Sequence, residues 1–269
     1  MFAEKKLKAN NKPLILVTND DGFDAKGIES LIEVSREFGE IVVIAPDISR
    51  SGMSHAITIK EPLRISRISE NDNLTIYSTN GSPVDCIKLA INQVLPKLPD
   101  LILSGINHGS NSSISVIYSG TMGAVMEGCI YGIPSIGFSI LDYDKNADFT
   151  ASKIYARYII RNVLNSGLNK GTCLNVNIPK GLSHELKGIK VCSQAKGMWK
   201  EEFDKRTDPH HCEYYWLTGS FINLEPENDA TDEWALSNKY VSIVPTIVDF
   251  TDYNSVNLLK NLENDPSHL

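Results

Sequence analysis

The feature that most constrains this chain is an apolar run ending in two adjacent aspartates and a glycine, Ile15-Leu16-Val17-Thr18-Asn19-Asp20-Asp21-Gly22. Apolar and β-branched residues that stop at a polar cluster are typical of a buried strand ending in a turn. Neighbouring strand side chains point to opposite faces, so the two carboxylates converge only if the chain has left the strand, which Gly22 permits. Adjacent carboxylates repel, and a bound cation relieves the repulsion. The run predicts a cation-binding strand end; the alternative is two solvated aspartates.

The patterns that follow this run alternate between helix and strand. Ile28, Leu31 and Ile32 recur at the spacing of one helix face, and residues 41–45 form the next apolar run. Together they predict a β-α-β unit with a right-handed crossover and a parallel strand pair. The first turn lacks the G-x-G-x-x-G of nicotinamide and flavin sites. Further strands are expected at residues 57–59, 74–78, 100–104, 134–140 and 174–178, and helices at 83–94, 122–131 and 149–164.

The sequence changes in character after residue 185. Runs at residues 189–192, 214–218 and 240–244 are expected as antiparallel strands, and residues 254–262 as a terminal helix. Trp199 and Phe203 lie in a charged segment and predict a subunit contact. The pair His210-His211 is either a metal-ligand pair or a loop feature. We therefore divide the chain into a flexible N-terminal tail (1–12), a Rossmann-like catalytic core (13–185) and a hairpin and C-terminal oligomerisation region (186–269).

Composition and charge argue against several classes of protein. The chain has 269 residues and a net charge of -7, which argues against a dedicated nucleic-acid binder. Its five cysteines are widely spaced with no C-x-x-C pair, so reduced thiols are expected rather than a disulfide framework or a zinc site. Residues 1–12 have no apolar signal-peptide core, and no apolar run is long enough to span a membrane. We expect a cytoplasmic protein without a membrane anchor.

Three expected loops at the same edge of the sheet supply oxygen donors. The first loop provides Asp20 and Asp21, the second provides Ser51 in a Ser-Gly turn, and the third provides Asn107. Carboxylate, hydroxyl and amide oxygens suit Mg²⁺, Mn²⁺ or Ca²⁺ and suit zinc poorly. Four protein oxygens leave room in an octahedral shell for water and a phosphate oxygen. We therefore expect one divalent metal ion, Mg²⁺ or Mn²⁺, with Ca²⁺ as a substitute.

A further polar segment offers a place for the phosphate. Ser119-Gly120-Thr121 precedes a predicted helix, and a helix start presents free backbone N–H groups to an anion. The same residues would also serve as an ordinary helix cap. Combined with the oxygen donors, this segment favours metal-assisted hydrolysis of a phosphoester, in which the metal polarises the phosphoryl oxygen and lowers the pKa of a bound water.

Five motifs occur along the chain in the order of a known family: Asn19-Asp20-Asp21-Gly22, Ala45-Pro46-Asp47 with Arg50-Ser51-Gly52, Gly81-Ser82-Pro83-Val84-Asp85-Cys86, Ser104-Gly105-Ile106-Asn107-His108-Gly109 and Tyr118-Ser119-Gly120-Thr121. Over residues 13–250 the chain resembles the SurE family, the stationary-phase survival nucleotidases. The resemblance implies a three-layer Rossmann-like α/β fold with a mostly parallel sheet flanked by helices. It also implies a homodimer or homotetramer, joined through a protruding β-hairpin and an exchanged C-terminal arm.

The resemblance also implies an activity and a set of site residues. The activity is a metal-dependent phosphatase acting on nucleoside 5′-monophosphates, with 3′-monophosphates left open. Asp20 and Asp21 match the catalytic carboxylates, and with Ser51 and Asn107 they match the metal ligands. The residues that match the phosphate surroundings are Asn111, Ser119, Gly120 and Thr121.

Several alternatives remain open at this point. Asp20 either assists attack by water or attacks phosphorus itself and forms an aspartyl phosphate. A haloacid-dehalogenase-type phosphatase normally has Asp-x-Asp, whereas these aspartates are adjacent. A nucleotide- or sugar-binding module without catalysis would also use a helix start for phosphate. The preferred base, the physiological metal and the choice between dimer and tetramer are left open by the sequence.

Overall fold

The computed structural model describes residues 12–200 and 202–263, so the predicted tail lies outside the described residues except for Lys12. The strands are β1 (Leu14–Thr18), β2 (Glu40–Pro46), β3 (Ile65–Asn71), β4 (Leu74–Thr79), β5 (Leu101–His108), β6 (Ser135–Ile140), β7 (Thr172–Ile178), β8 (Ile189–Val191), β9 (Gly197–Lys200), β10 (Phe203–Thr207), β11 (Glu213–Leu217), β12 (Ser220–Asn223) and β13 (Val241–Ile247). The helices are α1 (Lys26–Ser35), α2 (Pro83–Leu89), α3 (Gly120–Ile130), α4 (Thr150–Ser166), α5 (Asp232–Ser237) and α6 (Tyr253–Leu258).

One large sheet forms the centre of the molecule. Its nine strands follow the order β3-β4-β2-β1-β5-β6-β7-β13-β8. The strands from β4 to β7 run parallel, whereas β3 is antiparallel to β4 and β13 is antiparallel to β7. The parallel strands are apolar and buried along nearly their whole length, as expected for a sheet covered on both faces. The predicted mostly parallel sheet is confirmed.

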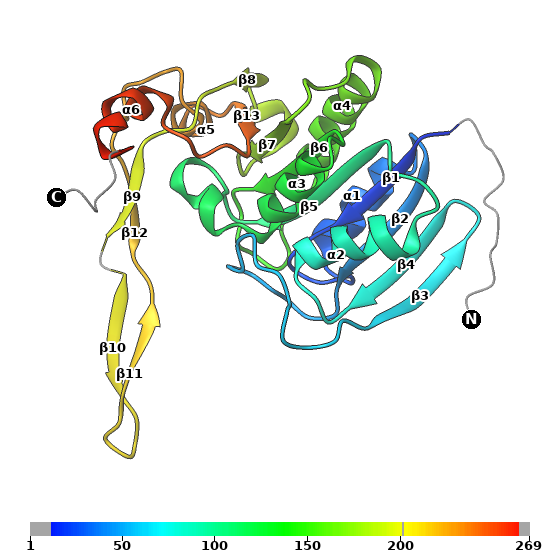
Figure 1. Ribbon diagram of the computed structural model, residues 1–269, viewed down its shortest axis with the longest axis horizontal. Coiled ribbons are helices and arrows are strands. Elements are labelled where there is room, and N and C mark those ends of the chain that lie inside the picture. The colour runs from blue at the N-terminus through cyan, green and yellow to red at the C-terminus, as the bar shows by residue number, and fades with distance from the viewer. Residues whose placement is uncertain (1–11, 201, 264–269) are drawn as a thin grey trace.

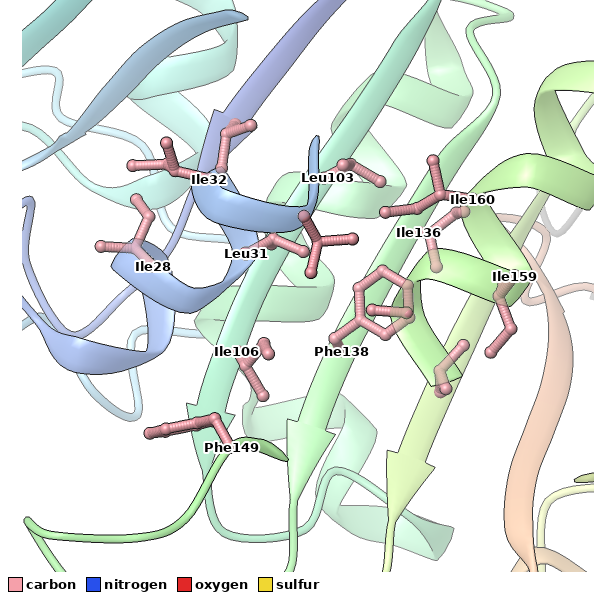
Figure 2. Packing of buried hydrophobic residues seen from close by; sticks show 14 of the residues in the cluster. Ile28, Leu31, Ile32, Leu103, Ile106, Ile136, Phe138, Phe149, Ile159 and Ile160 are labelled. Atoms are coloured by element: carbon pink, nitrogen blue, oxygen red, sulfur yellow. The ribbon is translucent and has the colours of Figure 1, made fainter. Parts of the chain in front are cut away.

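Helices cover both faces of this sheet and give the molecule three layers (Figure 1). Successive residues of β1 divide between two cores: Ile15 and Val17 pack with α1 and α4, and Leu14 and Leu16 pack with α2 and α3. This alternation follows from the twofold repeat of a strand. Figure 2 shows the first core, in which α1 and α4 lie over the middle strands, with the labelled side chains Ile28, Leu31, Ile32, Leu103, Ile106, Ile136, Phe138, Phe149, Ile159 and Ile160.

The chain reverses its direction of travel across the sheet at the β1–β5 pair. From β1 it proceeds outward through β2 to β4, and from β5 it proceeds the other way through β6 to β7. In open α/β sheets a ligand crevice forms outside the carboxyl ends of the strands at such a reversal. Asp20 follows β1 and Asn107 lies near the end of β5, so both are positioned at this crevice.

A long arm projects from the body of the protein (Figure 1). Its base is the antiparallel pair β9–β12 and its outer part is the antiparallel pair β10–β11, with His210 and His211 in the turn at the tip. The main sheet itself takes in β8 and β13, which lie beyond residue 185. The sheet therefore crosses the predicted boundary between core and oligomerisation region, and that division of the chain stays a prediction.

Two sequence-based expectations about strands are wrong, and one edge strand is not expected from the sequence. Residues 57–59 form no strand; Thr58 donates its backbone N–H to the Asp85 carboxylate at 3.1 Å, so this apolar segment is held on the start of α2 instead. The edge strand β3 was not expected, because its polar sequence lacks an apolar face. The strand at 189–192 was expected to be antiparallel, but β8 pairs in parallel with β13. Register and partner depend on neighbours distant in sequence, which local pattern does not specify.

No helix in the described part of the chain is long and apolar enough to cross a bilayer. All five cysteines are free thiols, and Cys212 is the exposed one among them. Free thiols agree with the predicted absence of a disulfide framework. The cytoplasmic location stays a prediction.

Candidate active site

Asp20 lies directly beyond β1 and is held by two other parts of the chain. Its side chain is buried, and Oδ1 accepts a hydrogen bond of 2.6 Å from the Thr121 hydroxyl on α3. Its carbonyl oxygen accepts a 2.7 Å hydrogen bond from the backbone N–H of Arg50 in the loop after β2. The Asn19 side chain bonds both the N–H and the C=O of Gly22 and closes the turn. The carboxylate is thus held by α3, and the backbone of Asp20 is held by the loop after β2.

The start of α3 approaches Asp20 closely at position 120, where a side chain would require Asp20 to shift by a few tenths of an ångström. A Cβ atom there would lie 3.0 Å from Asp20 Cβ and 3.1 Å from Asp20 Oδ2. Ser119 caps the helix, because its Oγ accepts a 3.0 Å hydrogen bond from Met122 N. The Met122 N–H is therefore bonded to Ser119 and the backbone of Thr121 is bonded to Asp20, and the helix start presents partial positive charge. Asp20 Oδ2 therefore lies beside an anion-attracting helix start.

Asp21 is half-buried and lies near the end of β5. Its Oδ2 atom is shielded from solvent and has no hydrogen-bond partner. The backbone and the imidazole of His108 both act to lower the Asp21 pKa, which places this carboxylate beside the residue that follows Asn107. A buried carboxylate oxygen without a partner is costly unless a cation or water satisfies it.

Burial dominates the electrostatics of the two aspartates. Desolvation raises the pKa of Asp20 to about 6, the hydrogen bond from Thr121 opposes this rise, and the charge of Asp21 adds to it. Burial likewise raises the pKa of Asp21 above its ordinary value. Ionisation of both carboxylates without a counter-ion is unfavourable, because each is buried and their charges repel. Perturbed acids in a crevice are typical of functional sites.

Ser51 lies next to Arg50, whose N–H reaches Asp20, so the second predicted loop does come to the first. The Ser51 side chain is exposed, and its Oγ lies 2.9 Å from Ser49 Oγ. Four to seven residues further on, the loop is fastened to helices: His55 Nε2 lies 2.9 Å from the Glu127 carboxylate of α3, and Thr58 bonds to α2. Residues after Ser51 thus fix the loop on the body of the protein.

Asn107 reaches this edge through an irregularity in the sheet. The register of β5 with β6 shifts between Ser104 and Asn107, and such a shift re-aims side chains at the end of a strand. Asn107 Nδ2 donates a 2.9 Å hydrogen bond to the carbonyl oxygen of Gly109. The amide oxygen is consequently the side-chain atom left for a cation.

Asn111, which is predicted to lie beside the phosphate, is buried in the protein. Its side chain is buried and Nδ2 donates to Ser139 Oγ at 2.8 Å. Its backbone N–H and C=O are held by the side chains of Asn177 and Asn175, each at 2.8 Å. These contacts fix the course of the loop between β5 and α3.

The donor set fits a divalent cation. Two carboxylates, one with an unpartnered buried oxygen, stand with a hydroxyl and an amide oxygen at one sheet edge. Hard oxygen donors of this kind suit Mg²⁺ or Mn²⁺. Within residues 12–200 and 202–263, no group of three or more His, Cys, Asp or Glu side chains is placed to hold a metal, so His210 and His211 gain no further such ligand.

The sequence does not reveal two contacts that support this site. The hydroxyl of Thr121 was predicted beside phosphate, but it donates to Asp20. Glu127 was not singled out, although its buried carboxylate binds both His55 and Lys88, the latter at 2.6 Å. A buried glutamate on an otherwise apolar helix face is the signal that could have identified it.

The sequence of this chain matches those of known proteins. The profile of the family described as Survival protein SurE matches residues 15–201. The chain belongs to the SurE family. It is 56% identical over 252 residues to a protein of Flavobacterium psychrophilum named 5′-nucleotidase SurE, covering 93% of this chain and 98% of that protein. A Bacteroides fragilis protein of the same name is 52% identical over 254 residues, covering 94% and 99%.

A solved structure agrees with the SurE assignment. The crystal structure of the SurE protein from Aquifex aeolicus superposes with a TM-score of 0.82 at 40% sequence identity, covering 94% of this chain and 100% of that one. The SurE fold expected from the motifs is therefore confirmed. The roles of the individual site residues stay predictions, although the structure brings the Asp20, Asp21, Ser51 and Asn107 segments to one edge of the sheet.

Proposed function

We propose that this SurE-family chain is a divalent-metal-dependent phosphatase that hydrolyses nucleoside 5′-monophosphates to nucleoside and phosphate. It is a phosphoric monoester hydrolase of the 5′-nucleotidase type, since relatives that match it over nearly their full length at 52–56% identity carry that name. The observation that carries the metal dependence is the buried, unpartnered Oδ2 of Asp21 beside the raised-pKa carboxylate of Asp20.

The residues that would hold the metal are Asp20, Asp21, Ser51 and Asn107. A bound divalent cation polarises a phosphoryl oxygen and lowers the pKa of a water molecule. Mg²⁺ and Mn²⁺ both prefer such oxygen donors, and Ca²⁺ fits the same donor types with a looser geometry.

The chain's own residues orient the substrate. Backbone N–H groups at the start of α3 are suited to bind phosphate oxygens, and the Ser119 hydroxyl, which accepts from Met122, still has its own proton to donate. Thr121 holds Asp20 Oδ1 and thereby leaves Oδ2 facing the helix start. Asp20 Oδ2 is the atom that takes a proton from the attacking water or, in the alternative, attacks phosphorus.

A matrix of metals and substrates tests this function. Purified protein is treated with EDTA and assayed with Mg²⁺, Mn²⁺ or Ca²⁺ on nucleoside 5′- and 3′-monophosphates, and on p-nitrophenyl phosphate as a generic ester. We expect phosphate release that requires added metal, with 5′-monophosphates as substrates; the result decides whether 3′-monophosphates are also cleaved. Nucleotide binding without release of phosphate under any metal would instead support a binding module.

Oxygen-labelled water separates the two roles of Asp20. In a single turnover, direct attack by water places the label in the released phosphate. Nucleophilic attack by the carboxylate forms an aspartyl phosphate; its hydrolysis at the carboxyl carbon places the label in Asp20, whereas its hydrolysis at phosphorus places the label in phosphate, so label found in Asp20 would reject direct attack by water. Mass spectrometry of the peptide that contains Asp20 reads the outcome.

The protein is also proposed to assemble as a homodimer or homotetramer through its projecting arm. Strand β11 exposes Tyr215, Trp216 and Leu217, which are 55%, 59% and 73% exposed. Phe203 on the paired strand is 66% exposed. Contiguous exposed aromatic and aliphatic side chains of this kind are typical of subunit contacts.

A further inference from the structure

An exposed apolar cluster borders the proposed phosphate site. Met53, Ile117 and Tyr118 are 41%, 50% and 55% exposed. Met53 follows Ser51 by two residues, and Tyr118 immediately precedes the helix-capping Ser119. Met53 therefore adjoins the proposed metal-binding segment, and Tyr118 adjoins the proposed phosphate-binding segment.

Hydrogen bonds hold the two parts of the cluster together. Ser54, the neighbour of Met53, donates its backbone N–H to the Tyr118 carbonyl at 3.2 Å. Its hydroxyl donates to the Ile117 carbonyl at 2.5 Å. Gly123 of α3 allows the loop to approach, because a Cβ atom there would lie 2.4 Å from the Ser54 carbonyl oxygen. The loop after β2 is thus fastened beside residues 117–118.

The chemistry of this cluster suits one part of the proposed substrate. Its three side chains carry no charge, so it is a poor second site for phosphate. A nucleoside monophosphate joins its phosphate through one sugar to a flat aromatic base. Aromatic and thioether side chains bind flat π-systems by stacking and by sulfur–ring contacts. An apolar surface next to a phosphate site is matched to such a base.

We propose that Met53, Ile117 and Tyr118 form the nucleobase-binding surface of this enzyme, an inference that rests on the proposed function. The base stacks on the Tyr118 ring, and Met53 and Ile117 supply the apolar surroundings. Every base has a π-face, so a surface that binds by stacking accepts different bases. The enzyme is therefore expected to prefer nucleotides over phosphate esters without a base, and to discriminate only modestly among bases.

Paired substrates test the surface. Adenosine 5′-monophosphate and ribose 5-phosphate share the sugar and the phosphate, but only the first has a base. Tyr118→Ala is expected to raise KM for adenosine 5′-monophosphate about tenfold, as loss of one base–aromatic stack does, and to leave KM for ribose 5-phosphate unchanged. Tyr118→Phe should behave like the unaltered protein, because the ring is retained. Met53→Ala should give a smaller rise confined to the nucleotide.

The control is Tyr158→Ala, since Tyr158 lies on α4 and is 58% exposed, much like Tyr118. It should change neither KM. An equal rise in KM for both substrates in Tyr118→Ala would overturn the proposal, because the defect would then lie in the phosphate site. An unchanged KM for both substrates would overturn it as well. A change of oligomeric state in Tyr118→Ala, measured by light scattering, would assign the cluster to a contact with a second copy and also overturn it.

A binding measurement separates this inference from the proposed function. Calorimetric titration with adenosine 5′-monophosphate does not depend on turnover. Should the unaltered protein bind the nucleotide without hydrolysing it, and Tyr118→Ala bind it about tenfold more weakly, the phosphatase assignment would fail and the nucleobase surface would stand. Equal affinity of both proteins would remove the surface whatever the catalytic result.

Discussion

A single carboxylate, Asp20, links the stability of this protein to its proposed chemistry. The side chain is 3% exposed, and burial raises its pKa to about 6. An ionised group in such a place costs folding free energy until a cation compensates it. Thr121 and the missing side chain at Gly120 show that the surroundings are shaped to keep the carboxylate there despite this cost.

Asp20→Asn should separate activity from stability. The folded-state pKa lies above the unfolded value, so the ionised form destabilises the metal-free protein above about pH 6, and the effect disappears once pH falls below about 4. In EDTA at pH 7–8 the variant should be more stable, by on the order of 2–3 kcal/mol. Its phosphatase rate should fall about 10²–10⁴-fold. Thermal unfolding between pH 4 and 8 measures the change in stability, and a steady-state assay measures the change in phosphatase rate.

Exposed Asp24 provides the matched control for this substitution. Asp24→Asn removes the same charge a few residues away, where the side chain is already in solvent. It should leave both the stability and the phosphatase activity close to those of the unaltered protein. An Asp20→Asn protein with normal turnover would remove Asp20 from the catalytic role.

At the scale of elements, helix α1 and strand β5 set the position of the third ligand loop. Gly27 faces the strand, and a Cβ atom there would lie 2.0 Å from the Ile106 carbonyl oxygen. The atom in the way belongs to the backbone of the residue before Asn107, so no rotamer change relieves the contact. Helix and strand can approach this closely only through glycine.

Gly27→Ala should consequently push α1 away from β5. We expect a loss of about 1–3 kcal/mol in the free energy of unfolding, the usual cost of overpacking, together with weaker binding of Mn²⁺ because Asn107 is displaced. Urea denaturation gives the first quantity and calorimetric metal titration the second. Glu29→Ala, an exposed position on the same helix, should change each only slightly. Undisturbed metal binding in Gly27→Ala would show that the helix does not set the position of Asn107.

At the scale of the whole molecule, the projecting arm stands apart from the layered core. Within the part of the chain that the structure describes, strands β10 and β11 pair with each other and with no other strand. All five residues of β11 are exposed. A two-stranded ribbon with an apolar surface is marginal alone in water and gains stability from a partner. Contact with another subunit therefore best explains why the arm has this structure.

Removal of the outer arm should dissociate the assembly without unfolding the core. Lys200 and Ser220 are paired opposite each other at the base, so residues 201–219 can be replaced by an Asn-Gly turn. We expect a smaller particle by light scattering and an unchanged far-ultraviolet circular dichroism signature of the α/β core. An assembly that persists after this deletion would place the subunit contact elsewhere.

The sequence by itself determined the parts of this protein that depend on near neighbours. Apolar runs located β1, β2, β5, β6 and β7, and the polar residues after or at the end of three of these strands identified Asp20, Asp21, Ser51 and Asn107 as oxygen donors. Parallel strands joined by helices place their carboxyl ends at one edge, so the proximity of these donors could be predicted. The motifs then identified the SurE family.

Only the tertiary structure decided how these residues are held. The Thr121 hydroxyl reaches Asp20 across 101 positions of sequence, and Glu127 reaches His55 across 72. It also decided that residues 57–59 dock on α2 and that β8 runs parallel to β13. Contacts of this kind depend on which distant surfaces meet during packing, and the local periodicity of a sequence does not encode that information.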